Sequence, residues 1–377
     1  MIPLSIPHLN GNELKYVTEC IETGWVSSAG AYVSKFENAV SDFAGTKYGV
    51  ATSNGTSGLH LAMHMLGIDK GDIVIVPNIT FIASANAVAY TKATPVFIDI
   101  DPDTWQLDLD LLDSYLADNC ELKENQWVLK SKGNKIAAIM PVHVLGNMCN
   151  MERLMSIANK YHIPVVEDAS ESLGSYYNGK HSGSFGLMNI FSFNGNKIIT
   201  TGGGGVIVTN DEEHAKRAKH LSTQAKVDPE TYFHDEIGFN YRLVNVLAAI
   251  GVAQMEQLPE FIKKKKHIDA YYRRYLSGVG DIRFQKVEQE VDPNCWLFTF
   301  YSEKQGEILK ALKENKIIAR PFWTPMNQLP MFTSNTYVQH SDHSRDIHKN
   351  CLSIPSSLNL TDKELDTVVK VIKSVYL

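Results

Sequence analysis

An acid and an amine within one glycine-rich stretch, residues 165–211, could together carry out carbonyl chemistry. Asp168 closely follows a pair of valines, and Lys197 stands 29 residues later beside two isoleucines. An amine in semi-apolar surroundings can act as a nucleophile toward a carbonyl carbon. Pyridoxal phosphate uses both groups, because it needs a lysine for its Schiff base and an aspartate that keeps its pyridine nitrogen protonated. The ordinary alternative is a solvated loop lysine and an aspartate that caps the next helix.

The elements that must position these two groups are three short apolar runs, Ile163–Val166, Met188–Phe193 and Val206–Thr209. Glycine-rich polar loops separate the runs, which is the pattern of buried strands that end in functional turns. In open α/β sheets the strand ends are where side chains converge on ligands. We therefore expect Asp168 at the end of the first strand and Lys197 just past the second.

Strands and helices alternate through the first two thirds of the chain. We expect further strands at Tyr48–Thr52, Ile73–Pro77, Pro95–Ile98 and Lys135–Pro141, and helices at Glu13–Thr23, Ala83–Ala89, Met151–Tyr161, Glu212–Leu221 and Leu243–Leu258. Such alternation is typical of a parallel sheet with right-handed crossovers. From Pro259 onward a long charged helix precedes a strand at Trp296–Phe300 and a helix at Gln305–Glu314. The sequence therefore predicts an α/β fold, with a large, mostly parallel sheet domain at residues 1–258 and a smaller α+β domain at residues 259–377.

Four segments of the central stretch carry a family pattern. They read EDASESLGS, GSFG, FSFNGNK and GGGGVIVTND, and their order and spacing resemble the DegT/DnrJ/EryC1/StrS family of sugar aminotransferases. The resemblance implies a fold-type I, aspartate aminotransferase-like enzyme that uses pyridoxal phosphate. It makes Asp168 the partner of the pyridine nitrogen, Ser192 a phosphate contact and Lys197 the catalytic Schiff-base lysine. Glu171 stands where the family often has Gln or His, so we expect it to bind the cofactor and to influence substrate choice.

Further cofactor contacts follow from the segment at residues 54–57 and from an aromatic residue. Small and hydroxyl residues at a helix start leave backbone N–H groups and the helix dipole free to hold an anion. The resemblance assigns Thr56 and Ser57 to the cofactor phosphate, although such residues also cap many helices. It likewise makes Phe81 stack on the cofactor ring, the alternative being an ordinary core phenylalanine.

The resemblance covers nearly the whole chain, including the opening residues 7–37 and the segments PVHVLG, GFNYR and RPFWTPM. It implies substrate contacts at Trp25, Ser27, His143, Arg242 and Trp323. In this family the asparagine of the third segment reaches the cofactor phosphate of the neighbouring subunit, so Asn240 implies a homodimer with shared active sites. The alternatives are a Trp25 that packs as a latch and an Asn240 that caps a helix.

These assignments predict an aminotransferase that acts on C4 of a nucleotide-linked 4-keto-6-deoxysugar, with L-glutamate as the amino donor. The segment RPFWTPM resembles enzymes of UDP-2-acetamido-4-keto-2,6-dideoxyhexoses, so we expect a UDP sugar whose 4-amino product enters a surface polysaccharide or another glycan. The close alternative is GDP-4-keto-6-deoxymannose, as in GDP-perosamine synthases. A sugar dehydratase of the same fold would carry His at position 197, and a non-catalytic regulator would have little use for Lys197 and Asp168 together.

Composition excludes several other classes of protein. The chain has 377 residues, of which 44% are hydrophobic and 21% charged, as in an ordinary globular protein. Its net charge of −6 gives no electrostatic case for binding nucleic acid or an anionic membrane. We find no signal peptide, no apolar run long enough to span a bilayer and no metal-ligand pattern. The five scattered cysteines include no C-x-x-C pair, which favours a reducing, cytoplasmic compartment.

Overall fold

The computed structural model describes residues 1–228 and 230–377. Its centre is formed by two four-stranded sheets, ordered β16-β3-β2-β6 and β7-β10-β11-β1. The strands are β1 (Tyr48–Thr52), β2 (Ile73–Pro77), β3 (Thr94–Ile98), β6 (Ile136–Ile139), β7 (Val166–Asp168), β10 (Met188–Ser192), β11 (Gly205–Thr209) and β16 (Tyr337–Val338). Parallel bridges from Ile139 to Val165 and from Val142 to Asp168 connect the two sheets, so they continue as one.

Most strands run parallel to their neighbours, as the predicted α/β class requires. The exception is β11, whose direction the sequence pattern did not predict. β2 pairs in parallel with β3 and β6, and β10 pairs in parallel with β7. β11 runs antiparallel to both β10 and β1. No helix separates β10 from β11, and a strand that follows its neighbour through a loop alone returns in the opposite direction.

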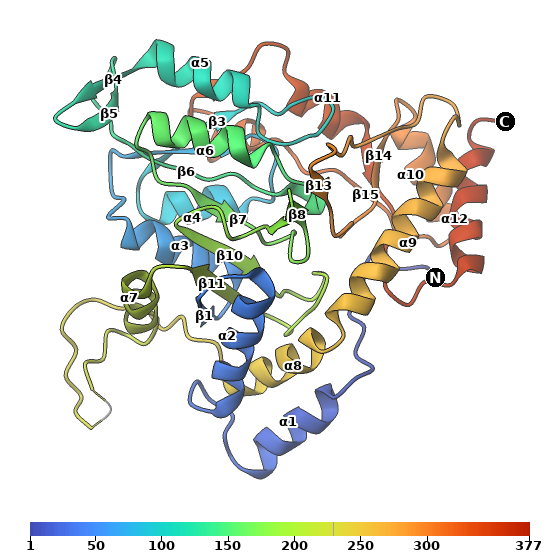
Figure 1. The fold of residues 1–377 in the computed structure, drawn as a ribbon. Helices are drawn as coiled ribbons and strands as arrows, with labels where there is room; N and C mark the ends of the chain where they lie inside the picture. Colours follow the sequence, from blue (N-terminus) through green and yellow to red (C-terminus); the bar gives the residue numbers. More distant parts are fainter. Residues whose placement is uncertain (229) are drawn as a thin grey trace.

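Helices cover both faces of this sheet (Figure 1). They are α2 (Ala31–Ala44), α3 (Gly55–Met65), α4 (Ala83–Tyr90), α5 (Leu109–Asn119), α6 (Met151–Lys160), α7 (Glu212–Ser222) and α8 (Asn245–Met255), and α1 (Glu13–Glu22) packs on α8. All five residues of β2 are buried. Its Val74 packs in a cluster with α3, α4 and α7, whereas Ile75 packs with α5 and α6. Successive side chains of a strand point to opposite faces, so a strand covered on both sides is apolar throughout.

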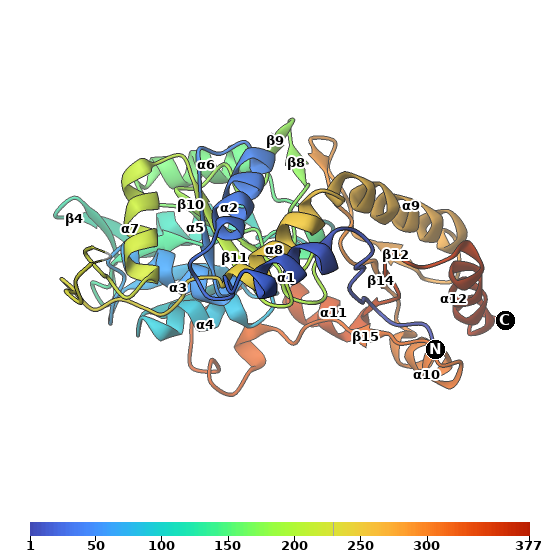
Figure 2. The same cartoon turned by 90° about the horizontal axis from the view of Figure 1, so that it is seen from below.

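The C-terminal part forms its own sheet, ordered β12-β14-β17-β15. Its elements are α9 (Leu258–Leu276), β12 (Arg283–Phe284), β14 (Thr299–Tyr301), α10 (Gln305–Glu314), β15 (Arg320–Pro321), α11 (His343–Asn350), β17 (Cys351–Ser353) and α12 (Asp362–Ser374). A separate hydrophobic cluster joins α9, α10 and α12 to this sheet. Figure 2 shows these three helices together at one end of the molecule. Ile2 belongs to the same cluster and bridges to Ile317. The domain division at residue 258 stays a prediction.

Small elements complete the fold, and some bounds differ from those expected. A hairpin pairs β4 (Cys120–Lys123) with β5 (Gln126–Leu129), and a three-stranded sheet joins β8 (Tyr176–Tyr177), β9 (Lys180–His181) and β13 (Val291–Asp292). The strand expected at residues 163–166 is found at Val166–Asp168. Pro164 lacks an N–H group and cannot donate to the ladder, so the regular strand begins later. Asp168 is thus the last strand residue. Among the described residues, no helix is long and apolar enough to cross a membrane.

Candidate active site

A cavity of about 570 Å³ opens beside the C-terminal end of β7. Seven of the residues expected in the site line this one cavity: Thr56, Phe81, Asp168, Glu171, Ser192, Lys197 and Trp323. They come from α3, β7, β10 and the loops after β2, β7, β10 and β15. The sheet therefore brings an acid, an amine, an aromatic ring and hydroxyl groups to one place, although they are spread over more than 260 residues of sequence.

Asp168 is fixed by two hydrogen bonds from neighbouring elements. Ser84 of α4 donates its hydroxyl to Oδ2 at 2.6 Å, and the N–H of Ser170 donates to Oδ1 at 3.1 Å. The Ser84 hydroxyl is in turn 2.9 Å from that of Thr80. Asp168 is only 4% exposed. A carboxylate oriented in this way presents its charge to a ligand without having to reorganise.

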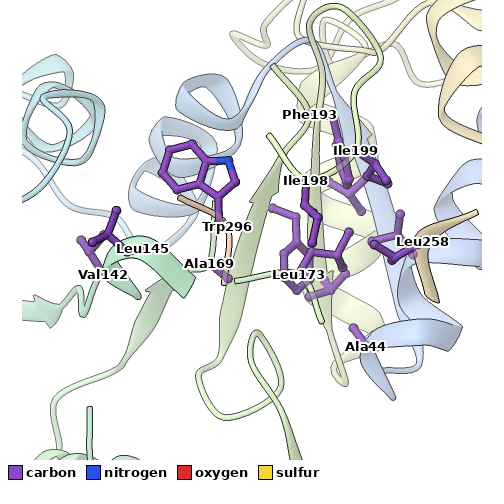
Figure 3. Packing of buried hydrophobic residues seen from close by; sticks show 14 of the residues in the cluster. Ala44, Val142, Leu145, Ala169, Leu173, Phe193, Ile198, Ile199, Leu258 and Trp296 are labelled. Atoms are coloured by element: carbon purple, nitrogen blue, oxygen red, sulfur yellow. The ribbon is translucent and has the colours of Figure 1, made fainter. Parts of the chain in front are cut away.

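Lys197 lies between a carboxylate and an aromatic ring. Its Nζ is 3.5 Å from Oε1 of Glu171 and 4.2 Å from the centre of the Trp296 ring. Trp296 is buried, and its Nε1 donates to the main-chain oxygen of Asn196 at 2.7 Å. Figure 3 shows Trp296 in the same buried cluster as Leu145 and Ile198. The amine is thus held inside the protein, with 12% of the lysine side chain exposed.

Glu171 has an environment that changes its acidity. Burial raises the pKa of the Glu171 carboxyl to about 7, and the nearby charge of Asp168 adds to this effect. Attraction to Lys197 and the N–H of Leu145, which donates to Oε2 at 2.8 Å, act in the opposite direction. At neutral pH this carboxyl can therefore both release and accept a proton.

The N-terminus of α3 forms the opposite wall of the cavity. The first turn of a helix leaves backbone N–H groups without intrahelical partners, which suits an anion. A Cβ atom added at Gly55 would lie 2.8 Å from Cβ of Ser192, so the glycine keeps the helix end close to β10. The structure differs from the prediction at Ser57. Its N–H and Oγ both bond to Oδ1 of Asn54, so Ser57 belongs to the helix cap and does not line the cavity.

His143 does not line this cavity within one chain, so its assignment as a substrate contact stays a prediction. Its side chain is fully buried, and Nε2 lies 2.8 Å from Oε2 of Glu167. The Glu167 carboxylate also accepts N–H groups from the loop at residues 183–186. Burial tends to raise the pKa of Glu167, but the hydrogen bonds from His143 and this loop outweigh it and leave the pKa below its usual value. His143 therefore supports the strand that ends in Asp168.

Arg242 forms a buried ion pair and does not line the cavity within one chain, so its substrate contact also stays a prediction. Its guanidinium pairs with the carboxylate of Glu37 and donates to the main-chain oxygen of Ala51 at 3.2 Å. The pair connects α2, β1 and the segment before α8, which satisfies both charges inside the protein.

The remaining residues that we expected in the site lie elsewhere on this chain. Trp25 and Ser27 lie in the loop between α1 and α2, where their main-chain oxygens accept from Asn245. Trp25 is 58% exposed, and Asn240 is exposed as well. None of the three lines the cavity within one chain. Sequence reasoning also missed Ser84 and Trp296, which no motif marks, and Arg320, which belongs to the segment RPFWTPM but was not assigned to the site.

The residues present fit pyridoxal phosphate. The cavity combines an aspartate, a lysine and a helix N-terminus with hydroxyl groups, which match the pyridine nitrogen, the aldehyde and the phosphate of the cofactor. Phe81 is 55% exposed at the cavity wall, so its ring is available for stacking.

Comparisons with known proteins agree with this geometry. Residues 7–373 match the model of the DegT/DnrJ/EryC1/StrS aminotransferase family. The chain is 37% identical over 378 residues to a GDP-perosamine synthase of Escherichia coli O157:H7, covering 100% of this chain and 98% of the relative. It is also 37% identical over 381 residues to the putative pyridoxal phosphate-dependent aminotransferase EpsN of Bacillus subtilis, covering 100% and 96%. The crystal structure of S. venezuelae DesV superimposes with a TM-score of 0.87 at 26% identity, covering 96% of this chain and 94% of DesV.

Proposed function

The chain belongs to the DegT/DnrJ/EryC1/StrS aminotransferase family and is a pyridoxal-phosphate-dependent sugar aminotransferase, and from this premise we propose that it aminates C4 of a nucleotide-linked 4-keto-6-deoxysugar. The amino donor in this proposal is L-glutamate. The observation that carries it is the cavity in which Lys197, Asp168 and the N-terminus of α3 meet. The 4-amino sugar would serve in the synthesis of a surface polysaccharide or another glycan.

Four residues of the cavity have a specific task in this proposal. When bound, pyridoxal phosphate supplies the electron sink that lets an amino group move between a donor and a carbonyl carbon. Asp168 would hold the proton on the pyridine nitrogen, and the N–H groups at the start of α3, with Thr56 and Ser192, would bind the phosphate. Lys197 would bind the aldehyde carbon and, once free, carry a proton at Nζ to and from the substrate carbon. The buried position of Lys197 keeps water away from this transfer.

We propose GDP-4-keto-6-deoxymannose as the sugar substrate. The sequence segment RPFWTPM alone placed a UDP-linked sugar first. The full-length relative of 37% identity that is named GDP-perosamine synthase supports the GDP alternative better. The UDP-linked 2-acetamido sugar remains the second candidate, because Trp323 of that segment lines the cavity.

A direct comparison of the two sugars as separate substrates tests this choice. The purified enzyme is given nitrogen-15 glutamate with the GDP or the UDP 4-keto sugar, and the isotope in the nucleotide-sugar product is measured by mass spectrometry. We expect transfer to the GDP sugar with the higher kcat/KM. Preference for the UDP sugar would reverse the assignment, and transfer to neither sugar would refute the proposed substrate class. A Lys197→Ala variant is the blank for non-enzymatic amination.

We further propose that the enzyme is a homodimer with shared active sites. Val227, Tyr232, Phe233 and Ile237 expose between 51% and 93% of their surface on one loop. Such a group of exposed apolar side chains is typical of an interface. Asn240 follows this loop and is exposed, so it is accessible to a second copy.

Subunit exchange tests the shared site. Lys197→Ala and Asn240→Ala proteins, each severely impaired alone, are mixed and allowed to exchange, which gives some dimers with one site that keeps both residues. We expect activity to return. If exchange is demonstrated by mass and the mixture stays inactive, Asn240 serves its own subunit.

All five cysteines are unpaired, which supports our proposal of a reducing, cytoplasmic location.

A further inference from the structure

The amine of Lys197 has one carboxylate partner among the residues that the structure describes. Oε1 of Glu171 lies 3.5 Å from Nζ, and no other described carboxylate oxygen comes within 4.0 Å. The ring of Trp296 lies on Nζ at 4.2 Å. An aromatic face and a carboxylate both attract a cation more strongly than a neutral amine. The amine of Lys197 therefore has two groups within reach that interact well with a cation.

Glu171 is held so that only one of its carboxylate oxygens can interact with the Lys197 amine. The N–H of Leu145 donates to Oε2 at 2.8 Å, and Nδ2 of Asn294 donates to the main-chain oxygen of Glu171 at 2.8 Å. Leu145 has φ +62°, a left-handed conformation that costs a leucine energy and that persists where the surroundings enforce it. The fixed Oε2 leaves Oε1 directed to Lys197.

We propose that Glu171 holds the free amine of Lys197 as an ammonium ion, and so keeps a proton donor ready beside the substrate carbon. Amination of the sugar places a hydrogen on C4. In that step an N–H bond of the Lys197 ammonium breaks and a C–H bond forms with the electron pair on C4, which leaves the neutral amine. Glu171 acts through Lys197 and is a positioning residue. This inference rests on the role proposed above for Lys197.

The replacement of the family's usual Gln or His by Glu has a physical consequence here. A glutamine could bond to the same N–H of Leu145, but its neutral amide would attract an ammonium ion far less than a carboxylate does. The titratable groups that face Glu171 are Lys197, from the loop after β10, and Asp168, from β7. The segment with Leu145 contributes a main-chain N–H, and Asn294 contributes an amide. Because the pKa of Glu171 is raised to about 7, its hold on the ammonium grows as the pH rises through that value.

The test measures the protonation of Lys197 without cofactor or sugar. The cofactor-free full chain is acetylated with limiting acetic anhydride, a neutral reagent that attacks only unprotonated amines, from pH 7 to pH 10. Acetylation of the Lys197 peptide is quantified by mass spectrometry against the exposed Lys123 in the same digest. Wild type is compared with Glu171→Gln, which is nearly isosteric, and with the control Glu121→Gln in the exposed β4–β5 hairpin.

We expect Lys197 in Glu171→Gln to be acetylated about tenfold faster than in wild type at pH 8, because an opposite charge this close shifts a proton equilibrium by one unit or more. The control should match wild type. A disturbance that only exposes Lys197 would speed its acetylation by the same factor at every pH, whereas a weaker base moves the midpoint of the pH profile to lower pH. Equal or slower acetylation in Glu171→Gln overturns the proposal.

A second variant tests the contact between the Lys197 amine and the Trp296 ring. Trp296→Leu removes the ring and should change Lys197 acetylation in the same direction by a smaller factor. Slower acetylation in this variant contradicts the proposal. Neither result depends on amine transfer, so failure here leaves the proposed function intact. A normal acetylation profile in a wild-type enzyme that aminates no sugar would instead contradict the proposed function alone.

Discussion

Replacing Glu167 by Gln should destabilise the protein strongly, although Glu167 touches no ligand. Its carboxylate is fully buried and accepts four hydrogen bonds. Oε2 accepts from Nε2 of His143 at 2.8 Å and from the N–H of Gly183 at 2.9 Å, and Oε1 accepts from the N–H groups of Phe185 and Gly186, both at 2.7 Å. Glutamine puts an NH₂ group in place of one oxygen. Facing Phe185 and Gly186 that NH₂ group meets two donors, but facing Gly183 it meets one, because His143 can carry its proton on Nδ1 and accept through Nε2.

The structure sets the size of the effect. In the less costly orientation one hydrogen bond to a charged group is lost, which contributes about 1.5–3 kcal/mol, so the free energy of unfolding should fall by at least that amount. The exposed Glu212→Gln is the matched control. It removes a carboxylate that pairs with Lys216 at the surface, where both side chains are more than half exposed, and should leave stability unchanged within error.

The pH dependence of stability gives a second, independent test of the role of Glu167. The pKa of Glu167 is lowered in the folded state, so its contribution is fully present above the unfolded value and is lost as the pH falls through the folded value. The stability difference between wild type and Glu167→Gln should therefore be constant from pH 8 to about pH 5 and shrink below that. Urea unfolding followed by circular dichroism measures it. A loss below about 1 kcal/mol at pH 7.5, or no change toward acid, would refute the reasoning.

Three further changes have defined outcomes. Asp168→Asn keeps the acceptor for Ser84 but removes the charge, so turnover should fall about a hundredfold or more with a much smaller loss of bound cofactor, and unchanged turnover would make the acid structural. Arg242→Met leaves Glu37 buried without its partner, so urea unfolding should show a loss of about 3–5 kcal/mol, and a loss within error would contradict the pair's importance. Burial lowers the pKa of Lys265 to about 7, so the folded state binds fewer protons than the unfolded chain above that pH. Wild-type stability should therefore rise relative to Lys265→Met by up to about 1.4 kcal/mol per pH unit between pH 7 and 10, and parallel curves would show that Lys265 does not titrate.

Local patterns in the sequence were enough to predict the elements that carry the site. Asp168 and Lys197 could be placed because each follows an apolar run, and a buried strand of the parallel sheet is recognisable from its composition alone. The direction of β11 could not be predicted, because a side-chain period of two is the same in parallel and antiparallel pairs.

The expected site residues that lie outside the cavity have partners that are distant in sequence. His143 Nε2 bonds to Glu167, 24 residues later, and Arg242 pairs with Glu37, 205 residues earlier. Ser57 is a different case, because its hydroxyl could serve a ligand or the helix cap, and only the side chain of Asn54 decides between them. Trp296 was missed because it comes from beyond the predicted domain division at residue 258, and no pattern in the sequence relates it to Lys197.

The central claim is that Lys197 binds the aldehyde of pyridoxal phosphate and transfers amine from glutamate to a sugar. The most direct measurement is the visible absorbance of the purified protein loaded with the cofactor, followed while glutamate is added. We predict a visible band in wild type that glutamate bleaches and that a 4-keto nucleotide sugar restores. A folded Lys197→Ala protein should lack both the band and the transfer. A Lys197→Ala protein that keeps the band and transfers nitrogen at the wild-type rate would contradict the account.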